Sequence, residues 1–204
     1  MDYQSLSEVR RLVEEANVSR WRGDASGGDD ASDARSAERR LDDLFGTGHA
    51  LATYGTLVPG GPNHHVVAPL EGEWAEGLIE GDLIPSGWGA EQGYPGFRPR
   101  AGGEAVAVWV LRASRLAGAW PELDRFEGEG YRRILVPVFA KEVDTAREAG
   151  ERRLCTVANL YASAEAGPDA DAPKRFTAAR PHDLIHPPSG KVHSRKSNFR
   201  FTEF

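Results

Sequence analysis

The sequence is poor in cysteine and in long apolar runs, and each shortage excludes a class of protein. Its one cysteine, Cys155, cannot form an internal disulfide, which agrees with a reducing compartment. Leu154 and Val157, which lie close to it in the sequence, are not bases that would activate a thiol, so we expect a buried structural cysteine. The longest apolar run, 105–111, is too short to span a bilayer, and the N-terminus has no basic region followed by an apolar one. We therefore expect a cytoplasmic protein with no membrane partner.

Excess positive charge and metal-ligand patterns are also lacking. The formal net charge is −6, which argues against a nucleic-acid partner because phosphate binding requires a basic face. The histidines at 64–65, 182 and 186 have no cysteine or carboxylate at ligand spacing, and the aspartates of 23–33 lack the order of a calcium loop. We expect no metal, and the oligomeric state stays open.

The first 48 residues have helical patterns on either side of a glycine-rich segment. Ser5 to Trp21 predicts an amphipathic helix, with Leu6, Val9, Val13 and Ala16 on one side. Gly23 to Asp33 has the composition of a flexible linker. Ser36 to Phe45 predicts a second helix, with Ala37, Leu41, Leu44 and Phe45 toward the core. We interpret residues 1–48 as a helical extension with a flexible linker, followed by a domain over 49–173 and a basic and aromatic tail over 174–204.

From His49 the pattern changes to short apolar runs separated by glycine, which is typical of strands in a closed or strongly curved sheet. Strands are predicted over 74–84, 105–113, 131–140 and 154–162, and the run 105–113 is apolar on both faces and should be central. In the first of these strands Trp74, Leu78 and Leu83 are the expected core residues. A helix is predicted over 116–126, with Pro121 dividing it into two pieces. The segment 87–99 is predicted to be an irregular loop.

Tyr54-Gly55-Thr56-Leu57 follows the apolar run 50–52 and precedes a loop rich in glycine and proline. A strand that ends in such a turn leaves backbone N–H groups unpaired, which makes an anion or oxyanion cradle. Many strands also end in glycine simply to turn, so this segment alone does not decide between the two interpretations.

Glu127 ends the predicted helix and is followed by Gly128-Glu129-Gly130-Tyr131, which turns the chain into a strand. This geometry directs a carboxylate toward an apolar cavity, where desolvation raises its pKa. The alternative is a solvated glutamate at the end of a helix, which is the usual place for this residue type.

The two segments together resemble the γ-glutamylcyclotransferase-like family, which includes the AIG2-like proteins and γ-glutamylamine cyclotransferase. The resemblance rests on Tyr-Gly-Thr-Leu at 54–57 and Leu-Asp-Arg-Phe-Glu-Gly at 123–128 with Tyr-Arg-Arg at 131–133, and on Gly-Tyr-Pro at 93–95 and Gly-Glu at 103–104 between them. It covers roughly residues 49–162.

The resemblance implies an α+β fold, a small mixed β-barrel with flanking helices. It places the catalytic glutamate at Glu127 and the substrate-binding residues at Tyr54, Gly55, Thr56, Leu57 and Tyr131. The implied reaction releases 5-oxoproline from a γ-glutamyl amine or γ-glutamyl amino acid without a cofactor. The alternative is a non-catalytic module that binds a small molecule or a protein on the same fold.

Overall fold

A computed structural model describes residues 6–22, 29–85, 95–141 and 152–167 of the 204-residue chain. Predictions for the Gly-Tyr pair at 93–94, for the segment 142–151 and for the tail 174–204, including His182 and His186, lie outside the described residues. So does the part of the predicted linker that covers 23–28.

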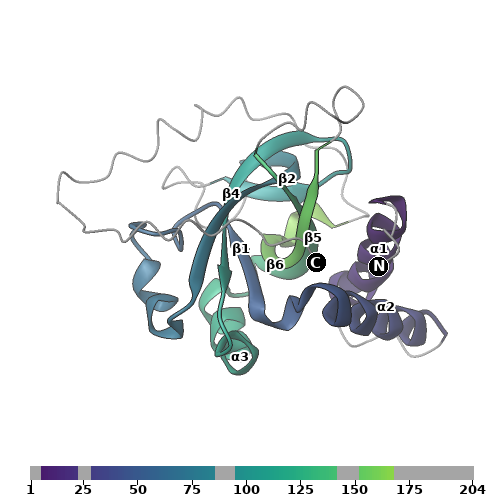
Figure 1. The fold of residues 1–204 in the computed structure, drawn as a ribbon, viewed down its shortest axis with the longest axis horizontal. Helices are drawn as coiled ribbons and strands as arrows, with labels where there is room; N and C mark the ends of the chain where they lie inside the picture. The colour runs from purple at the N-terminus through teal and green to yellow at the C-terminus, as the bar shows by residue number, and fades with distance from the viewer. Residues whose placement is uncertain (1–5, 23–28, 86–94, 142–151, 168–204) are drawn as a thin grey trace.

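Five strands close into a barrel, and a sixth short strand extends it (Figure 1). The barrel order is β2-β4-β1-β6-β5, and pairing of β5 with β2 through Leu78 and Phe139 closes it. All these neighbours are antiparallel except β1 and β6, which run parallel, so the sheet is mixed. The strands are β1 Ala50–Thr53, β2 Glu73–Ile84, β3 Gly96–Pro99, β4 Glu104–Arg112, β5 Tyr131–Phe139 and β6 Leu154–Ser163.

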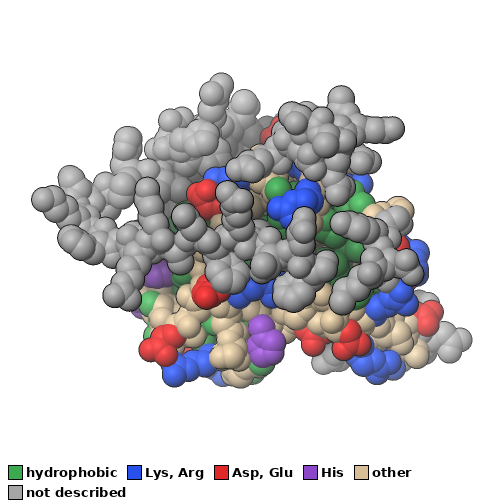
Figure 2. Space-filling model, viewed as in Figure 1, with side chains coloured by type: hydrophobic (Ala, Val, Ile, Leu, Met, Phe, Trp, Pro, Cys, Tyr) green, Lys and Arg blue, Asp and Glu red, His purple; other side chains and the backbone are tan. Residues whose placement is uncertain are grey.

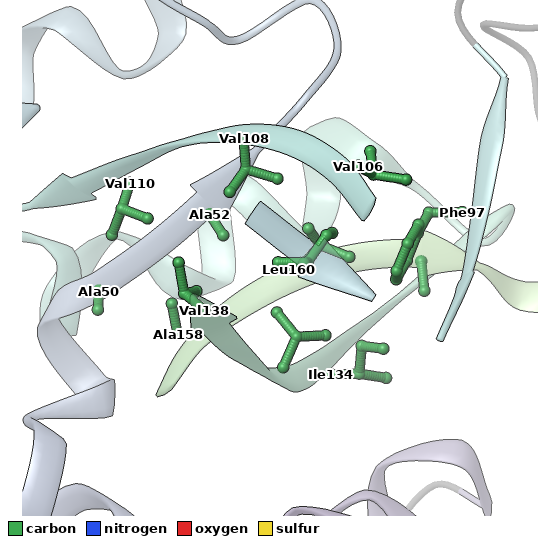
Figure 3. Packing of buried hydrophobic residues seen from close by; sticks show 13 residues of the cluster. Ala50, Ala52, Phe97, Val106, Val108, Val110, Ile134, Val138, Ala158 and Leu160 are labelled. Atoms are coloured by element: carbon green, nitrogen blue, oxygen red, sulfur yellow. The ribbon is translucent and has the colours of Figure 1, made fainter. Parts of the chain in front are cut away.

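Alternate residues of each strand fill the inside of the barrel, as the two-residue period of a strand requires (Figure 3). In β5 Ile134 and Val136 point inward, whereas Leu135 between them belongs to a separate core outside. Phe97 of β3 is fully buried in the inner core and adds the largest side chain to it. The strands are therefore buried on both faces where helices cover the outside.

Helix α3 (Leu116–Glu127) covers one outer face of the barrel. Leu116, Trp120 and Leu123 recur at helical spacing and pack on Leu51 of β1 and Tyr161 of β6. The indole N–H of Trp120 donates to the carbonyl of Gly48 at 3.0 Å, which fixes the helix beside the start of β1. This packing sets the position of the residue at the end of the helix, Glu127.

Helices α1 (Leu6–Arg22) and α2 (Asp29–Phe45) lie together on another side of the barrel (Figure 1). Their shared core includes Val9, Leu12 and Leu41 and is continuous with Leu135 of β5 and Val157 of β6. Asn17 adds a polar anchor, because its amide donates to the Leu135 carbonyl and its oxygen accepts from the Leu135 N–H, both at 2.8 Å. The helical pair is thus packed against the barrel.

The mixed barrel with flanking helices confirms the predicted fold class, and the predicted helices and strands are present with small shifts at their ends. Strand β4 is central as predicted, between β2 and β1. Cys155 is half-buried, where a buried cysteine was predicted, and partial burial raises the pKa of its thiol.

Two strand predictions were wrong in part. Gly96–Pro99 forms β3, where a loop was predicted, because Phe97 pairs with Leu83 and fills the inner core, a long-range contact that local glycine and proline signals hide. In β2 the most buried apolar side chains are Ile79 and Ile84, whereas the predicted core residues, Trp74, Leu78 and Leu83, are half-buried.

Three helix predictions also need correction. Asp29–Asp33 is helical and belongs to α2, consistent with the preference for acidic residues in a first turn. Leu44 is 48% exposed, since Ala37, Leu41 and Phe45 already occupy the buried face at spacings of four residues. Helix α3 is continuous through Pro121, because the loss of one N–H is offset by the packing of the flanking turns.

The described surface carries charge of both signs. On the face shown in Figure 2, acidic and basic side chains are interspersed over the described residues. No helix among the described residues is long and apolar enough to cross a membrane.

Replacing Asn17 with alanine should destabilise the protein by about 2 kcal/mol or more, because the buried Leu135 N–H and carbonyl then lose their partners. The change is measured as the free energy of unfolding in urea. Glu14→Ala, at an exposed position of the same helix, is the control and should change stability by less than about 0.5 kcal/mol. Equal stability of the two variants would contradict the role assigned to Asn17.

Candidate active site

A small cavity of about 50 Å³ opens where β1 ends, between the loop that follows it and the end of α3. The six residues predicted from the sequence all line it. Its lining residues are Leu51, Ala52, Thr53, Tyr54, Gly55, Thr56, Leu57, Pro95, Glu127, Tyr131, Leu160 and Tyr161.

The loop after β1 is held by hydrogen bonds to its carbonyl groups. The N–H of Asn63 donates to the Thr56 carbonyl at 3.0 Å, and Nδ1 of His64 lies 3.1 Å from the Leu57 carbonyl. Because a carbonyl only accepts, His64 Nδ1 must carry the hydrogen in this contact. In a trans peptide the N–H points opposite to the C=O, so the Thr56 contact turns the Leu57 N–H away from Asn63.

The backbone amides of this loop bear on ligand binding. Within the described part of the chain, the N–H groups of Gly55, Thr56 and Leu57 donate to no protein acceptor. Unpaired amides at the wall of a cavity must find water or a ligand, and they favour a negatively charged group. The interpretation of this loop as an anion cradle stays a prediction.

Glu127 reaches the cavity because α3 ends directly after it. Gly128 has φ 72° and ψ −171°, and its N–H donates to the Asp124 carbonyl at 3.0 Å. Glycine adopts a positive φ without strain, so the chain leaves the helix abruptly at this point and enters β5 at Tyr131. The glutamate side chain is left at the cavity wall, anchored by the buried Leu123 one turn earlier.

The environment of Glu127 favours its neutral form. Burial raises the pKa of this carboxyl to about 7 from an ordinary value of 4.5. Among the described residues no cation forms an ion pair with it, and no hydrogen-bond donor contacts it, so nothing offsets the loss of water. A carboxyl that titrates near neutral pH is suited to both accept and return a proton.

Tyrosines surround this carboxyl. Burial raises the pKa of Tyr54 well above its usual value, and the charges of Tyr131 and Glu127, which line the same cavity, raise it further. The Tyr54 ring packs on Phe97 with 5.9 Å between centroids. Burial, followed by a hydrogen bond to Asp124, raises the pKa of Tyr161, so its hydroxyl remains a donor. These hydroxyls are neutral polar groups at the cavity.

Asp124 fixes the last turn of α3 to the barrel. It accepts the Tyr161 hydroxyl at 2.7 Å and pairs with Arg133 through two hydrogen bonds of 2.8 and 3.2 Å. The Arg133 guanidinium lies 4.6 Å from the Trp120 ring centroid on the same helix. Because Asp124 is three residues before Glu127, these contacts restrain the position of the glutamate.

The sequence interpretation did not include Tyr161, Leu160 or Pro95 among the lining residues. The alternation of β6 offered a signal for Tyr161, because it lies on the opposite face of the strand from Leu160, toward α3. Pro95 and Asp124 lie within the segments 93–95 and 123–128 on which the resemblance rests, but neither was predicted as a site residue. Among the described residues, no group of three His, Cys, Asp or Glu could hold a metal ion.

The protein is a small closed barrel in which the Glu127 carboxyl and the loop after β1 line one cavity. The sequence pattern of the family described as "Gamma-glutamyl cyclotransferase, AIG2-like" matches residues 51–173, and the chain belongs to this family. The resemblance noted from the sequence is thereby confirmed.

Two solved structures are similar to this chain. A crystal structure of an AIG2-like protein from Mus musculus has 22% identity and a TM-score of 0.43, and the match covers 69% of this chain and 95% of that one. A solution structure of A2LD1 has 22% identity and a TM-score of 0.41, with 69% and 97% covered. A search of curated proteins found no match.

The raised pKa of Glu127 makes folding stability depend on pH. Below pH 4.5 the carboxyl is protonated in both the folded and unfolded states. Between pH 4.5 and about 7 the folded state keeps a proton that the unfolded state loses, so stability falls as pH rises. Above pH 7 the loss of folding stability is complete. It is of the order of 3 kcal/mol, because each pH unit between the two pKa values is worth about 1.36 kcal/mol.

Glu127→Gln should therefore gain stability over the wild type as pH rises from 5 to 8, because the amide has no charge to desolvate. Urea unfolding at pH 5, 6, 7 and 8 measures the gap between the two proteins. Glu122→Gln, at an exposed position of the same helix, is the control and should show no growing gap. A gap between Glu127→Gln and wild type that stays constant over this range would show that Glu127 is not desolvated.

Proposed function

We propose that this protein releases 5-oxoproline from a γ-glutamyl amine or γ-glutamyl amino acid, with Glu127 as general acid and base. The observation that carries the proposal is a carboxyl with a pKa of about 7 in the same small cavity as the unpaired amides of the Tyr54–Leu57 loop. Membership of the cyclotransferase family supports the reaction type.

The reaction needs little more than orientation and proton transfer. The substrate α-amine attacks its own γ-carbonyl, a new C–N bond closes a five-membered ring, and the original amide C–N bond breaks to release the amine. Both reacting groups belong to one molecule, so a bound, folded-back conformation removes much of the entropic barrier. Glu127 takes a proton from the α-ammonium and returns one to the leaving nitrogen.

Burial brings the two proton-exchanging groups close in pKa. An ordinary glutamate near 4.3 and an α-amine near 8 differ by an amount worth roughly 5 kcal/mol. With Glu127 at about 7, the difference falls to about one unit, or roughly 1.4 kcal/mol. Efficient general base catalysis favours such a match near the working pH.

The reaction also requires groups that bind the negative charge of the substrate, and in this proposal the loop after β1 provides them. In this proposal the N–H groups of Gly55, Thr56 and Leu57 hold either the substrate α-carboxylate or the oxyanion that forms on the γ-carbonyl. The hydroxyls of Tyr54 and Tyr131 bind the same part of the substrate. These residue roles extend the sequence prediction and are testable one by one.

Glu127→Gln should fold and lose turnover by at least about 100-fold, because the amide keeps the shape of the side chain and cannot accept a proton. Release of 5-oxoproline from a panel of γ-glutamyl compounds measures the loss. Activity within a few-fold of wild type would remove Glu127 from the mechanism. Binding of these compounds by wild type without 5-oxoproline release would instead favour a non-catalytic binding module.

Gly55→Ala should weaken substrate binding about tenfold or more, because a methyl group enters the small cavity beside the amides and disturbs charge-assisted hydrogen bonds. Gly55 is not among the residues with positive φ, so the expected cause is space rather than backbone strain. Calorimetry with the inactive Glu127→Gln protein, with and without Gly55→Ala, separates binding from turnover.

The control for this change is Gly118→Ala, where an added Cβ meets no atom within 4 Å. Gly60, in the same loop as Gly55, is unsuitable because its φ of 79° makes any side chain strained. Unchanged affinity after Gly55→Ala would mean that the glycine only turns the chain.

A further inference from the structure

A second, larger hollow adjoins the candidate active site. Its volume is about 480 Å³, against about 50 Å³ for the first cavity, and the two share Tyr131 and Tyr161 in their walls. A cavity of 50 Å³ has room for only a few water-sized groups, so it accommodates the reacting part of a substrate at most. The remainder of a γ-glutamyl compound, which is its leaving group, must extend outward, and the larger hollow lies directly beside the shared tyrosines.

The hollow is lined by three arginines, which come from the end of α3 and the start of β5. Arg133 is neutralised by its two hydrogen bonds to Asp124. Arg125 is exposed and pairs with no acidic group within the described part of the chain. Arg132 contacts the carbonyls of Glu129 and Tyr131 at 3.3 and 3.2 Å, both through Nη1, and has no carboxylate partner among the described residues.

The charge balance of the hollow is positive. After the Asp124–Arg133 pair is set aside, two guanidiniums, Arg125 and Arg132, face one carboxylate, Glu129. The carbonyl contacts of Arg132 also hold its guanidinium at the start of β5, which reduces the entropy lost when it binds an anion. A planar guanidinium is the side chain best suited to bind a carboxylate through paired hydrogen bonds.

We propose that this hollow is the leaving-group subsite and that Arg125 and Arg132 bind a carboxylate carried by the leaving group. The inference rests on the proposed function, and it narrows the substrate class to γ-glutamyl amino acids, whose released amine carries a carboxylate. An amine without a carboxylate leaves the two guanidiniums unpaired, and a cationic amine meets their repulsion.

The experiment compares two substrates that differ only in this charge, γ-glutamyl-alanine and γ-glutamyl-alaninamide. Release of 5-oxoproline gives kcat/KM for each. Wild type should prefer the acid by at least about tenfold, the effect expected of charge-assisted hydrogen bonds. In the Arg125→Gln/Arg132→Gln double variant the preference should fall to about one, because kcat/KM for the acid falls.

A matched control is the double variant Arg100→Gln/Arg115→Gln. Both arginines are exposed, line neither cavity, and pair with Asp82 and Glu71. Each double variant removes two positive charges, so the net charge of the protein changes by the same amount in both. The wild-type preference should persist in this control. Loss of the preference in both double variants would assign it to the overall charge and overturn the subsite.

The remaining outcomes separate the subsite from the proposed function. Turnover of acid and amide at equal rates, or faster turnover of the cationic γ-glutamyl-ethylenediamine, would overturn the subsite and leave the function standing. If no compound is turned over, calorimetry measures whether wild type binds the acid and the amide. Binding that is selective for the acid and requires Arg125 and Arg132 would retain the subsite and reject the reaction. Absence of both turnover and binding would overturn both.

Discussion

The barrel strands are buried on both faces, and this double burial holds the helices in place. Each barrel strand directs one set of side chains inward and the other toward a helix, as Ile134 and Leu135 do in β5. The inner core closes the barrel, and the outer cores fix α3 and the α1–α2 pair. Because α3 is held along its length by Leu116, Trp120 and Leu123, its last residue cannot move toward water without loss of packing.

The same packing accounts for the unfavourable environment of Glu127. A carboxyl whose pKa is raised to about 7 by burial reduces folding stability at neutral pH, and the cost is met by the packing of the helix that carries it. The contacts of Asp124 with Arg133 and Tyr161 restrain the same turn by charge-assisted hydrogen bonds. Desolvation of this kind is expected at functional positions, where an unfavourable local environment is offset by favourable packing in the rest of the protein.

The sequence was sufficient for features that depend on short-range patterns. The apolar run of β4, the helical spacing of α3 and the glycine turn after β1 each predicted the observed element, and the motifs pointed to Glu127 and the Tyr54–Leu57 loop, which line one cavity. Features that depend on long-range packing were missed. β3 exists because Phe97 fills the inner core, and Tyr161 reaches the cavity because β6 pairs with β5 and faces α3. Neither partner could be identified from neighbours along the chain.

The N-terminal helices show how far such long-range contacts extend. Arg20 of α1 donates to Glu38 of α2, to the Arg133 carbonyl of β5 and to Asn159 Oδ1 of β6, and burial lowers the pKa of its guanidinium. The Asn159 amide in turn donates to the Thr47 carbonyl at 2.7 Å, just before β1 begins. Since β1 leads directly into the Tyr54–Leu57 loop, and Arg133 holds Asp124, one half-buried arginine, Arg20, connects α1 to both walls of the cavity. The boundary predicted at residue 48 therefore separates the helical sequence patterns from the strand patterns. The side chains on its two sides nevertheless pack together and form hydrogen bonds with one another.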